Sequence, residues 1–173
     1  MGQLLNMALI LATLGCGVMA GIYCAFSGFI MRALATTGPA TGTEAMVAIY
    51  RVILKSSFMP LFFGSSLLCL ALLIAALILR PAGHLPMAIG AAVYLAGMLG
   101  VTILRNVPLN QLLDAQGAVI WPEYLRNWTL WNHLRTASSL IAAARPANMP
   151  APELVAKAAG SSAQKSSSHR AFT

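Results

Sequence analysis

The chain alternates between long apolar stretches and short polar segments, and four of the stretches approach the length of a membrane span. They cover about residues 4–34, 58–79, 85–104 and 121–144. A helix needs about 20 residues, each rising about 1.5 Å, to cross the hydrocarbon core of a bilayer. The pattern therefore predicts an all-α protein, a transmembrane four-helix bundle whose membrane domain covers residues 1–144.

The segments between these stretches predict how the helices are connected. Residues 80–84 are too few for more than a turn, so the second and third helices should form an antiparallel hairpin. Residues 35–57 begin with a loop signal and continue into an expected amphipathic helix over 44–55. Residues 105–127 are expected to form a second large loop on the same side. Residues 145–173 are rich in Pro, Ala, Ser and Lys, which predicts a disordered C-terminal tail.

Composition places the chain in a membrane. Hydrophobic residues make up 58% of the sequence and charged residues only 9%, and the mean hydropathy is +0.76. Soluble domains carry about 25% charged residues, so this chain could not cover a water-facing surface. The first stretch lacks a basic leader and exceeds the roughly 7–15 apolar residues of a signal peptide, so we expect it to remain as a span. We expect a bacterial inner (plasma) membrane protein in contact with membrane lipid.

The basic residues do not indicate nucleic-acid binding. The formal net charge is +7, from 11 Lys and Arg against 4 Asp and Glu, but the basic residues are scattered singly. Nucleic-acid binding needs them clustered on one face, so we predict no nucleic-acid partner. The two predicted sides of the membrane carry equal numbers of Lys and Arg, so the positive-inside rule does not decide the orientation. We place both termini in the cytoplasm as a working assignment.

The sequence contains no motif for a metal or a nucleotide. Cys16, Cys24 and Cys69 are isolated in apolar stretches, where cysteine usually packs as a small residue. The 3 histidines lack a His-x-x-x-His spacing, and 4 acids in the whole chain are too few for a carboxylate-bridged metal centre. We therefore predict neither a metal site nor a cofactor.

A polar string closes the third apolar stretch and reads Arg105-Asn106-Val107-Pro108-Leu109-Asn110. If the helix continues through it, Asn106 and Asn110 share one face, because they are four residues apart. If Pro108 breaks the helix, Asn106 can instead cap a new one. The string is also compatible with a simple helix end carrying an interfacial arginine.

A second polar string occupies residues 124–136 of the fourth stretch. At about 100° per residue, Trp128, Asn132 and Arg135 fall on one stripe of a helix, and His133 lies about 100° round from Asn132. Polar side chains in hydrocarbon normally face the bundle interior, which predicts a polar chamber between the helices. The alternative is an aromatic belt at the membrane surface with a snorkelling arginine.

Four strings in this sequence are similar to those of a known family. They are Gly21-Ile22-Tyr23-Cys24-Ala25-Phe26-Ser27, the stretch from Tyr50-Arg51 to Phe58-Met59, Asn106-Val107-Pro108-Leu109-Asn110, and Trp128-Thr129-Leu130-Trp131-Asn132-His133-Leu134-Arg135-Thr136. Together they resemble the anthrone oxygenase family of small four-span membrane proteins over about residues 4–144. The family's long Ala/Leu run after the last string is replaced here by Arg145-Pro146. Either the fourth span begins near Trp121 and tilts little, or the C-terminus has diverged from the family.

The resemblance implies an enzyme that oxidises an anthrone-like polycyclic phenol to a quinone with O2, without metal or flavin. Such a reaction needs a base, donors for a phenolate-like oxyanion and a dry aromatic pocket. By hypothesis His133 is the base, and Arg135 with Asn132 or Asn106 stabilises the oxyanion. The residues expected to bind substrate are Asn110, Trp128, Trp131, Phe26 and Tyr50.

A second hypothesis is a non-catalytic membrane protein that binds a lipophilic ligand or partner helices, with its polar side chains as interhelical glue. It predicts that substitutions of Asn110 or Asn132 lower stability slightly and abolish no activity. A transporter or channel is less favoured, because the chain shows no inverted repeat. Each hypothesis is compatible with a homo-oligomer.

Overall fold

The computed structural model describes residues 2–144, and over that range the chain is helical throughout. The elements in order are α1 (Gly2–Ala25), the π-helical turn η1 (Phe26–Ile30), α2 (Met31–Thr36), α3 (Pro39–Ile53), α4 (Phe58–Leu79), α5 (His84–Tyr94), the π-helical turns η2 (Leu95–Gly100) and η3 (Thr102–Asn106), α6 (Val107–Gln116), the 3-10 turn η4 (Gly117–Ile120) and α7 (Trp121–Ala143). The all-α prediction is confirmed. The predicted tail over residues 145–173 lies outside the described residues.

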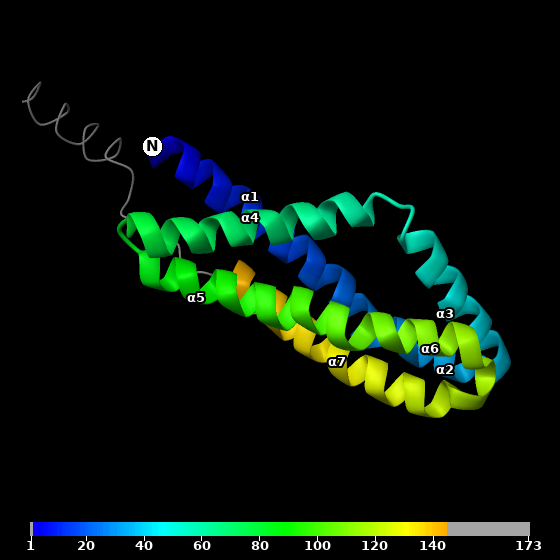
Figure 1. Ribbon diagram of the computed structural model, residues 1–173. Coiled ribbons are helices and arrows are strands. Elements are labelled where there is room, and N and C mark those ends of the chain that lie inside the picture. The colour runs from blue at the N-terminus through cyan, green and yellow to red at the C-terminus, as the bar shows by residue number, and fades with distance from the viewer. Residues whose placement is uncertain (1, 145–173) are drawn as a thin grey trace, which may run out of the picture.

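The helices form an elongated bundle (Figure 1). Helix α4 and helix α5 lie side by side as a hairpin, and α6 continues the direction of α5. The chain then reverses at η4, and α7 returns along α1. Gly117 opens this reversal with a backbone φ of 69°, a left-handed conformation that glycine adopts without strain. The first and last helices of the described chain are therefore neighbours.

Three helical segments are long and apolar enough to cross a membrane, which defines an integral membrane protein. They are Gly2–Thr36, Phe58–Leu79 and His84–Ala143. The third contains the reversal at η4, so it is two helices in space. Large apolar side chains such as Ile78 and Leu104 are more than 70% exposed, as lipid-facing residues are. The number of four membrane crossings stays a prediction.

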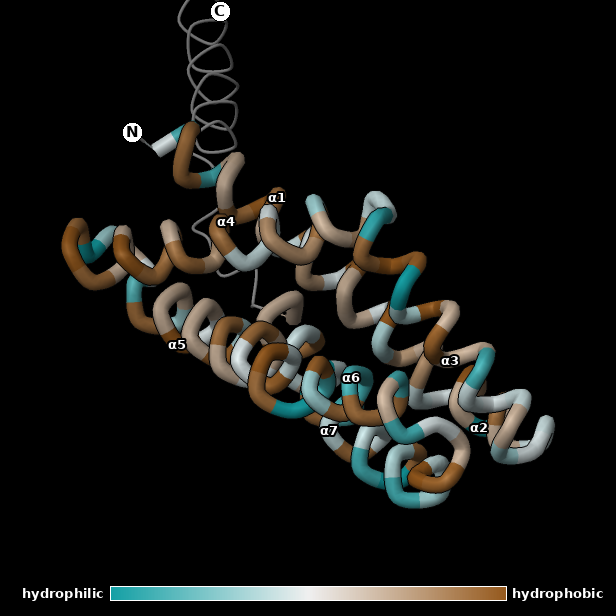
Figure 2. The backbone as a smooth tube through the Cα atoms, turned by 45° about the vertical axis from the view of Figure 1, so that its right-hand side comes forward, coloured by the Kyte–Doolittle hydropathy of each residue, from teal (hydrophilic) through white to brown (hydrophobic). Residues whose placement is uncertain are grey.

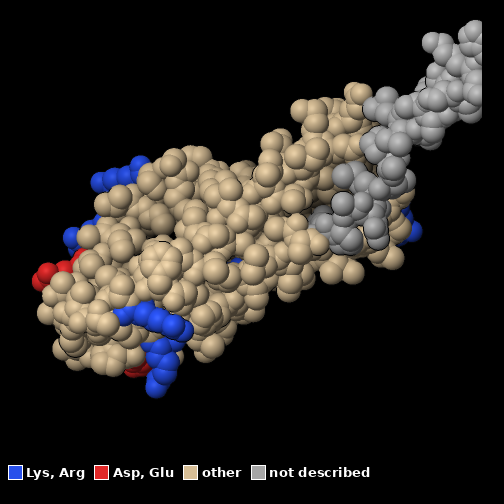
Figure 3. All heavy atoms as spheres, turned by 180° about the vertical axis from the view of Figure 1, so that it is seen from behind, with Lys and Arg blue, Asp and Glu red and all other residues tan. Residues whose placement is uncertain are grey.

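Polar residues are concentrated at one end of the bundle. Hydrophobic residues dominate α4 and α5, whereas hydrophilic positions gather around α6 and the start of α7 (Figure 2). Seen from behind, the middle of the bundle surface is almost free of Lys, Arg, Asp and Glu, and charged side chains gather mostly at the α2–α3–α6 end (Figure 3). An uncharged band between charged ends is what a bilayer requires.

The predicted hairpin between the second and third apolar stretches is confirmed. Helix α4 ends at Leu79 and α5 begins at His84. Arg80 and Gly83 both take left-handed backbone conformations, with φ of 44° and 78°. Helix α3 also confirms the helix expected within residues 35–57.

The prediction of a large loop over residues 105–127 is wrong, because the helix continues to Gln116. The reason is the π-helical turn η3, in which Val107 N–H donates to the carbonyl of Thr102 instead of the usual residue four back. Proline lacks an N–H and its ring clashes with the carbonyl four residues earlier. The wider turn just before Pro108 accommodates it without ending the helix.

Three glycines let neighbouring helical segments approach closely. A Cβ at Gly15 would lie 3.0 Å from Ser65 Cβ, one at Gly42 would lie 2.5 Å from the Trp121 ring, and one at Gly97 would lie within 3 Å of the Ser138 side chain. Tight contacts therefore join α1 to α4, α3 to the start of α7, and η2 to α7.

Candidate functional site

One stripe of α7 supplies the centre of the site. Trp128, Asn132 and Arg135 are all buried, with Asn132 fully enclosed and Arg135 only 4% exposed. These positions are four and three residues apart, so they share the helix face that packs against α1 and η2. The predicted stripe is confirmed.

Arg135 is held by contacts on several sides. Its Nη2 donates to Oδ1 of Asn132, and its Nη1 lies 3.4 Å from Oγ1 of Thr102 in η3. The guanidinium carbon also lies 4.3 Å from the ring centre of Tyr23 and 5.0 Å from that of Trp128. Guanidinium groups stack favourably on aromatic faces in this way. The charged group is therefore fixed between α1, η3 and α7.

Within residues 2–144, Arg135 has no carboxylate at ion-pair distance. The one ion pair in this range joins Arg51 to Asp114 at 2.7 Å, at the surface of the bundle. The buried Nε of Arg135 also has no hydrogen-bond partner there. A buried charge without a counterion is costly, roughly 2.5–3.5 kcal/mol for arginine at a helix centre on insertion scales. The arrangement therefore favours an anionic group arriving from outside the chain.

Asn132 connects this arginine to the first helix. Its Nδ2 donates to the carbonyl of Tyr23 at 2.7 Å and to Oγ of Ser27 at 2.6 Å. Its Oδ1 accepts from Arg135, so both ends of the amide are used. Tyr23 lies in α1, whereas Ser27 lies in the π-helical turn η1, which starts at Phe26. Turns of this kind often occur at functional sites, because they free backbone groups and redirect side chains.

An apolar cavity of about 200 Å³ opens beside Arg135. Aromatic rings form much of its wall, contributed by Tyr23, Phe26, Tyr50, Phe58, Phe62, Phe63 and Trp128. Polar groups reach the wall from Arg135, Thr102 and Asn110. The volume is far larger than the roughly 30 Å³ of one water molecule. A mostly apolar chamber with a few convergent polar groups is typical of a small-molecule site.

The two asparagines of the 105–110 string have different positions. Asn110 lines the cavity and accepts a hydrogen bond from the Tyr124 hydroxyl at 2.8 Å. Asn106 is buried outside the cavity lining, where its Nδ2 donates to the carbonyl of Trp128 at 3.2 Å. Asn106 thus ties η3 to α7 behind the cavity wall.

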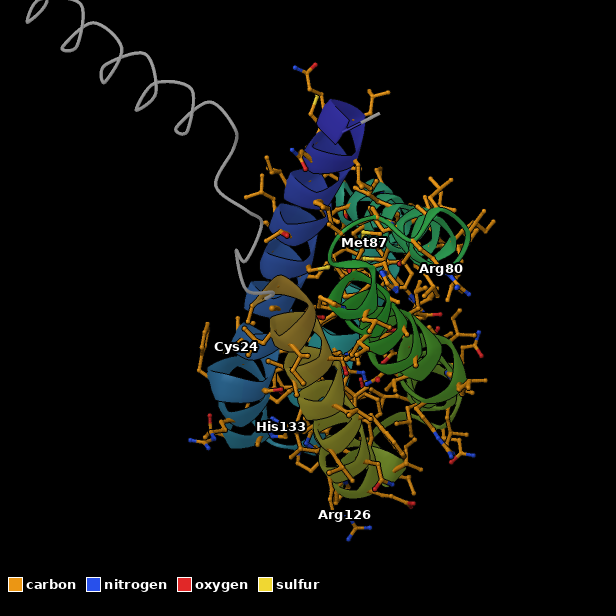
Figure 4. The ribbon with its side chains drawn as sticks, turned by 90° about the vertical axis from the view of Figure 1, so that its left-hand side faces the viewer. Cys24, Arg80, Met87, Arg126 and His133 are labelled. Atoms are coloured by element: carbon orange, nitrogen blue, oxygen red, sulfur yellow. The ribbon has the colours of Figure 1, made fainter. Side chains whose placement is uncertain are left out.

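The structure does not bring His133 or Trp131 to the cavity. His133 is exposed and lines a separate hollow beside the α1–α2 helix, and in Figure 4 it lies on α7 away from the bundle interior. Trp131 is half-buried under Arg105, whose guanidinium carbon lies 4.9 Å from the ring centre. Of the nine predicted site residues, Arg135, Asn110, Trp128, Phe26 and Tyr50 line the cavity. Asn132 and Asn106 support it from behind.

Sequence reasoning missed two residues that contact the arginine, Tyr23 and Thr102. Tyr23 lies four residues before Ser27 in the Gly21–Ser27 string, so both face α7. This four-residue spacing could have identified Tyr23 from the sequence. Thr102 carries no such signal, because its contact depends on how η3 is rotated against α7.

The fold and the site define a class of protein, a membrane-embedded helical bundle with a buried arginine beside an aromatic cavity. Within residues 2–144 this arginine has no carboxylate partner. The chain belongs to the anthrone oxygenase family, whose sequence profile matches residues 46–145. The matched segment contains Arg135, Asn132 and Asn110, whereas Tyr23, Phe26 and Ser27 precede it. No match was found among curated proteins or among solved structures.

Proposed function

We propose that this protein is a cofactor-independent, anthrone-type oxygenase that crosses the membrane four times and binds the oxyanion of its substrate at Arg135. The observation that carries the proposal is the burial of Arg135 in an aromatic cavity without a carboxylate partner in the described chain. Family membership supports the reaction class. The substrate would be a polycyclic phenol of the anthrone type, and the co-substrate O2.

The chemistry needs a stabilised anion more than it needs a strong base. Loss of a proton from an anthrone or its phenol tautomer gives a phenolate-like oxyanion, with electron density spread to the opposite ring carbon. That carbon can pass electrons to O2. The CH2 group becomes C=O with one oxygen atom of O2, and the other oxygen leaves as water. Lowering the energy of the oxyanion therefore favours proton loss and raises the fraction of substrate present as the anion that reacts with O2.

Arg135 fits the role of oxyanion donor. Asn132 and Thr102 each hold one terminal nitrogen of the guanidinium, while Nε has no partner among residues 2–144. Fixed donors in a water-poor site act more strongly than in solvent, since they need no reorganisation during the reaction. Asn132 is a positioning residue, and Asn106 fixes the backbone of Trp128.

The proposal gives no base role to His133, since its exposed ring lies in a hollow that shares no lining residue with the cavity. The substrate proton would leave to water at the cavity mouth, driven by the arginine. Flat aromatic surfaces of Trp128, Phe26 and Tyr50 would hold the ring system, and Asn110 would contact a ring hydroxyl. O2 is apolar and would enter along the same walls.

The test is turnover of an anthrone by the purified protein in detergent micelles, followed by quinone absorbance and O2 uptake. We expect Arg135→Gln to lower kcat by about 100-fold or more, as loss of an oxyanion donor does. The matched control is Arg105→Gln, which removes the same charge outside the cavity. Full activity in Arg135→Gln, with the control equally active, would contradict the proposal.

A second candidate is a non-catalytic protein that binds a lipophilic molecule in the same cavity. The predominance of apolar and aromatic wall residues favours this possibility. It predicts that the wild type binds an anthraquinone, measured by quenching of tryptophan fluorescence, without consuming O2 when an anthrone is supplied. Binding without turnover would select this candidate.

A further inference from the structure

A second hollow lies on the outer face of the bundle, between the α1–α2 helix and α7. Its volume is about 470 Å³ and it opens outward. Figure 4 shows two residues of its lining along α7, His133 beside the α1–α2 helix and Arg126 nearer the end of the bundle. The hollow shares no lining residue with the inner cavity.

Every polar side chain that lines this hollow can donate a hydrogen bond. The polar residues are Ser27, Arg32, Arg126, Thr129 and His133, and no Asp or Glu is among the lining residues. Within residues 2–144, neither Arg32 nor Arg126 forms an ion pair. Two uncompensated guanidinium groups at one hollow create a positive potential that attracts an anion.

The floor of the hollow offers hydroxyl groups as well. Oγ1 of Thr129 is buried without a hydrogen-bond partner in the described chain. Ser27 Oγ accepts a hydrogen bond from Asn132, which leaves its own O–H free to donate. Buried polar groups are nearly always paired in native structures, so an unpaired hydroxyl beside two arginines indicates a ligand that supplies acceptors.

The remaining lining is apolar. Met31, Leu125 and Leu130 complete much of the wall, and Leu130 is 60% exposed. The hollow lies toward the end of the bundle where charged side chains gather (Figure 3). A ligand for this place therefore combines an anionic head with an apolar body at the level of the membrane surface.

We propose that the hollow binds the phosphate of an anionic membrane phospholipid, with Arg32 and Arg126 as its charge partners. Thr129 and Ser27 donate to phosphate oxygens, and the acyl chains lie against the exposed leucines of α7. Free inorganic phosphate could bind the same two arginines, but it has no apolar part to contact the apolar wall. The proposal does not rest on the oxygenase activity.

The experiment is native mass spectrometry of the purified chain in detergent, with phosphatidylglycerol, phosphatidylcholine or inorganic phosphate added in turn. The test variant is the double substitution Arg32→Gln and Arg126→Gln. The matched control is Arg51→Gln with Arg105→Gln, which removes two positive charges that lie outside the hollow. All four side chains are exposed, so both variants should fold.

We expect the wild type to retain phosphatidylglycerol in preference to phosphatidylcholine. The test variant should lose this retention by about tenfold or more, given roughly fivefold for each arginine at a membrane surface. The control should stay within about twofold of the wild type, since its charges lie outside the hollow. Thr129→Val should cause a smaller loss in the same direction.

Three results would overturn the proposal. The first is equal retention of the two lipids by the wild type. The second is an equal loss in the test and control variants, which would show a general charge effect. The third is binding of inorganic phosphate as tight as that of phosphatidylglycerol, which would assign the hollow to free phosphate.

Discussion

The inner cavity and the outer hollow are both built on α7 around arginine, yet they place that charge in opposite surroundings. Arg135 is buried, fixed by Asn132 and Thr102 and stacked on two rings. Arg32 and Arg126 are exposed beside an open hollow. At 4 Å two unit charges attract by about 1 kcal/mol in water and about 4 kcal/mol at an effective dielectric constant of about 20. Burial, more than residue type, thus decides what each arginine can do.

A hydrogen bond between Asn132 and Ser27 links the two regions. Asn132 accepts from Arg135 on the inner side and donates to Ser27, which lines the outer hollow. Both the oxygen and the nitrogen of the Asn132 amide form hydrogen bonds in the interior of the bundle. Substitution of Asn132 should therefore disturb the inner cavity far more than the outer hollow. Variants of residues on either side test this asymmetry.

Asn132→Leu should have the largest effect on stability. It removes the acceptor of Arg135 and the donor to Tyr23 O and Ser27 Oγ, leaving a buried charge and a carbonyl with fewer partners. We expect a loss of about 2–3 kcal/mol in the free energy of unfolding, measured by denaturation in mixed micelles. Asn127→Leu is the control, because that side chain makes only a 3.4 Å bond to Glu123 at the surface. Similar losses of stability in both variants would show that the buried contacts of Asn132 matter no more than the surface contact of Asn127.

Gly97→Val should have the next largest effect. A Cβ at this position would lie within 3 Å of the Ser138 side chain, so η2 and α7 must separate. Overpacking of this kind costs about 1–3 kcal/mol, and the separation should widen the cavity beside Arg135. Gly17→Val is the control, since nothing lies within 4 Å of its Cβ position. The measurement is again unfolding in mixed micelles, and equal stability of the two variants would show that the η2–α7 contact does not matter.

His133→Gln should have the smallest effect on turnover. The imidazole lies in the outer hollow, away from the cavity that holds Arg135. We expect kcat to change by less than about threefold, against the 100-fold or greater loss expected for Arg135→Gln. The measurement is kcat of both variants in steady-state assays with the same anthrone. A loss in His133→Gln as large as that in Arg135→Gln would restore the histidine as a base.

The α7 string shows how far local reasoning reaches into the site. A helical period alone put Trp128, Asn132 and Arg135 on one buried stripe, and the structure has them there. The same period puts His133 about 100° away from Asn132, which is where its exposed ring lies. The base role hypothesised for His133 rests on its imidazole chemistry, and the His133→Gln assay tests it.

The sequence by itself determined the helical spans, the hairpin at residues 80–83 and the buried stripe of α7. These depend on hydropathy, length and period, which are local properties of the chain. The path of the helix past Pro108 at η3 and the contacts of Tyr23 and Thr102 with Arg135 could be seen in the tertiary structure alone. Those outcomes depend on how each helix is rotated against its neighbours. That rotation is set by close contacts between distant segments, such as Gly97 with Ser138, which no local pattern encodes.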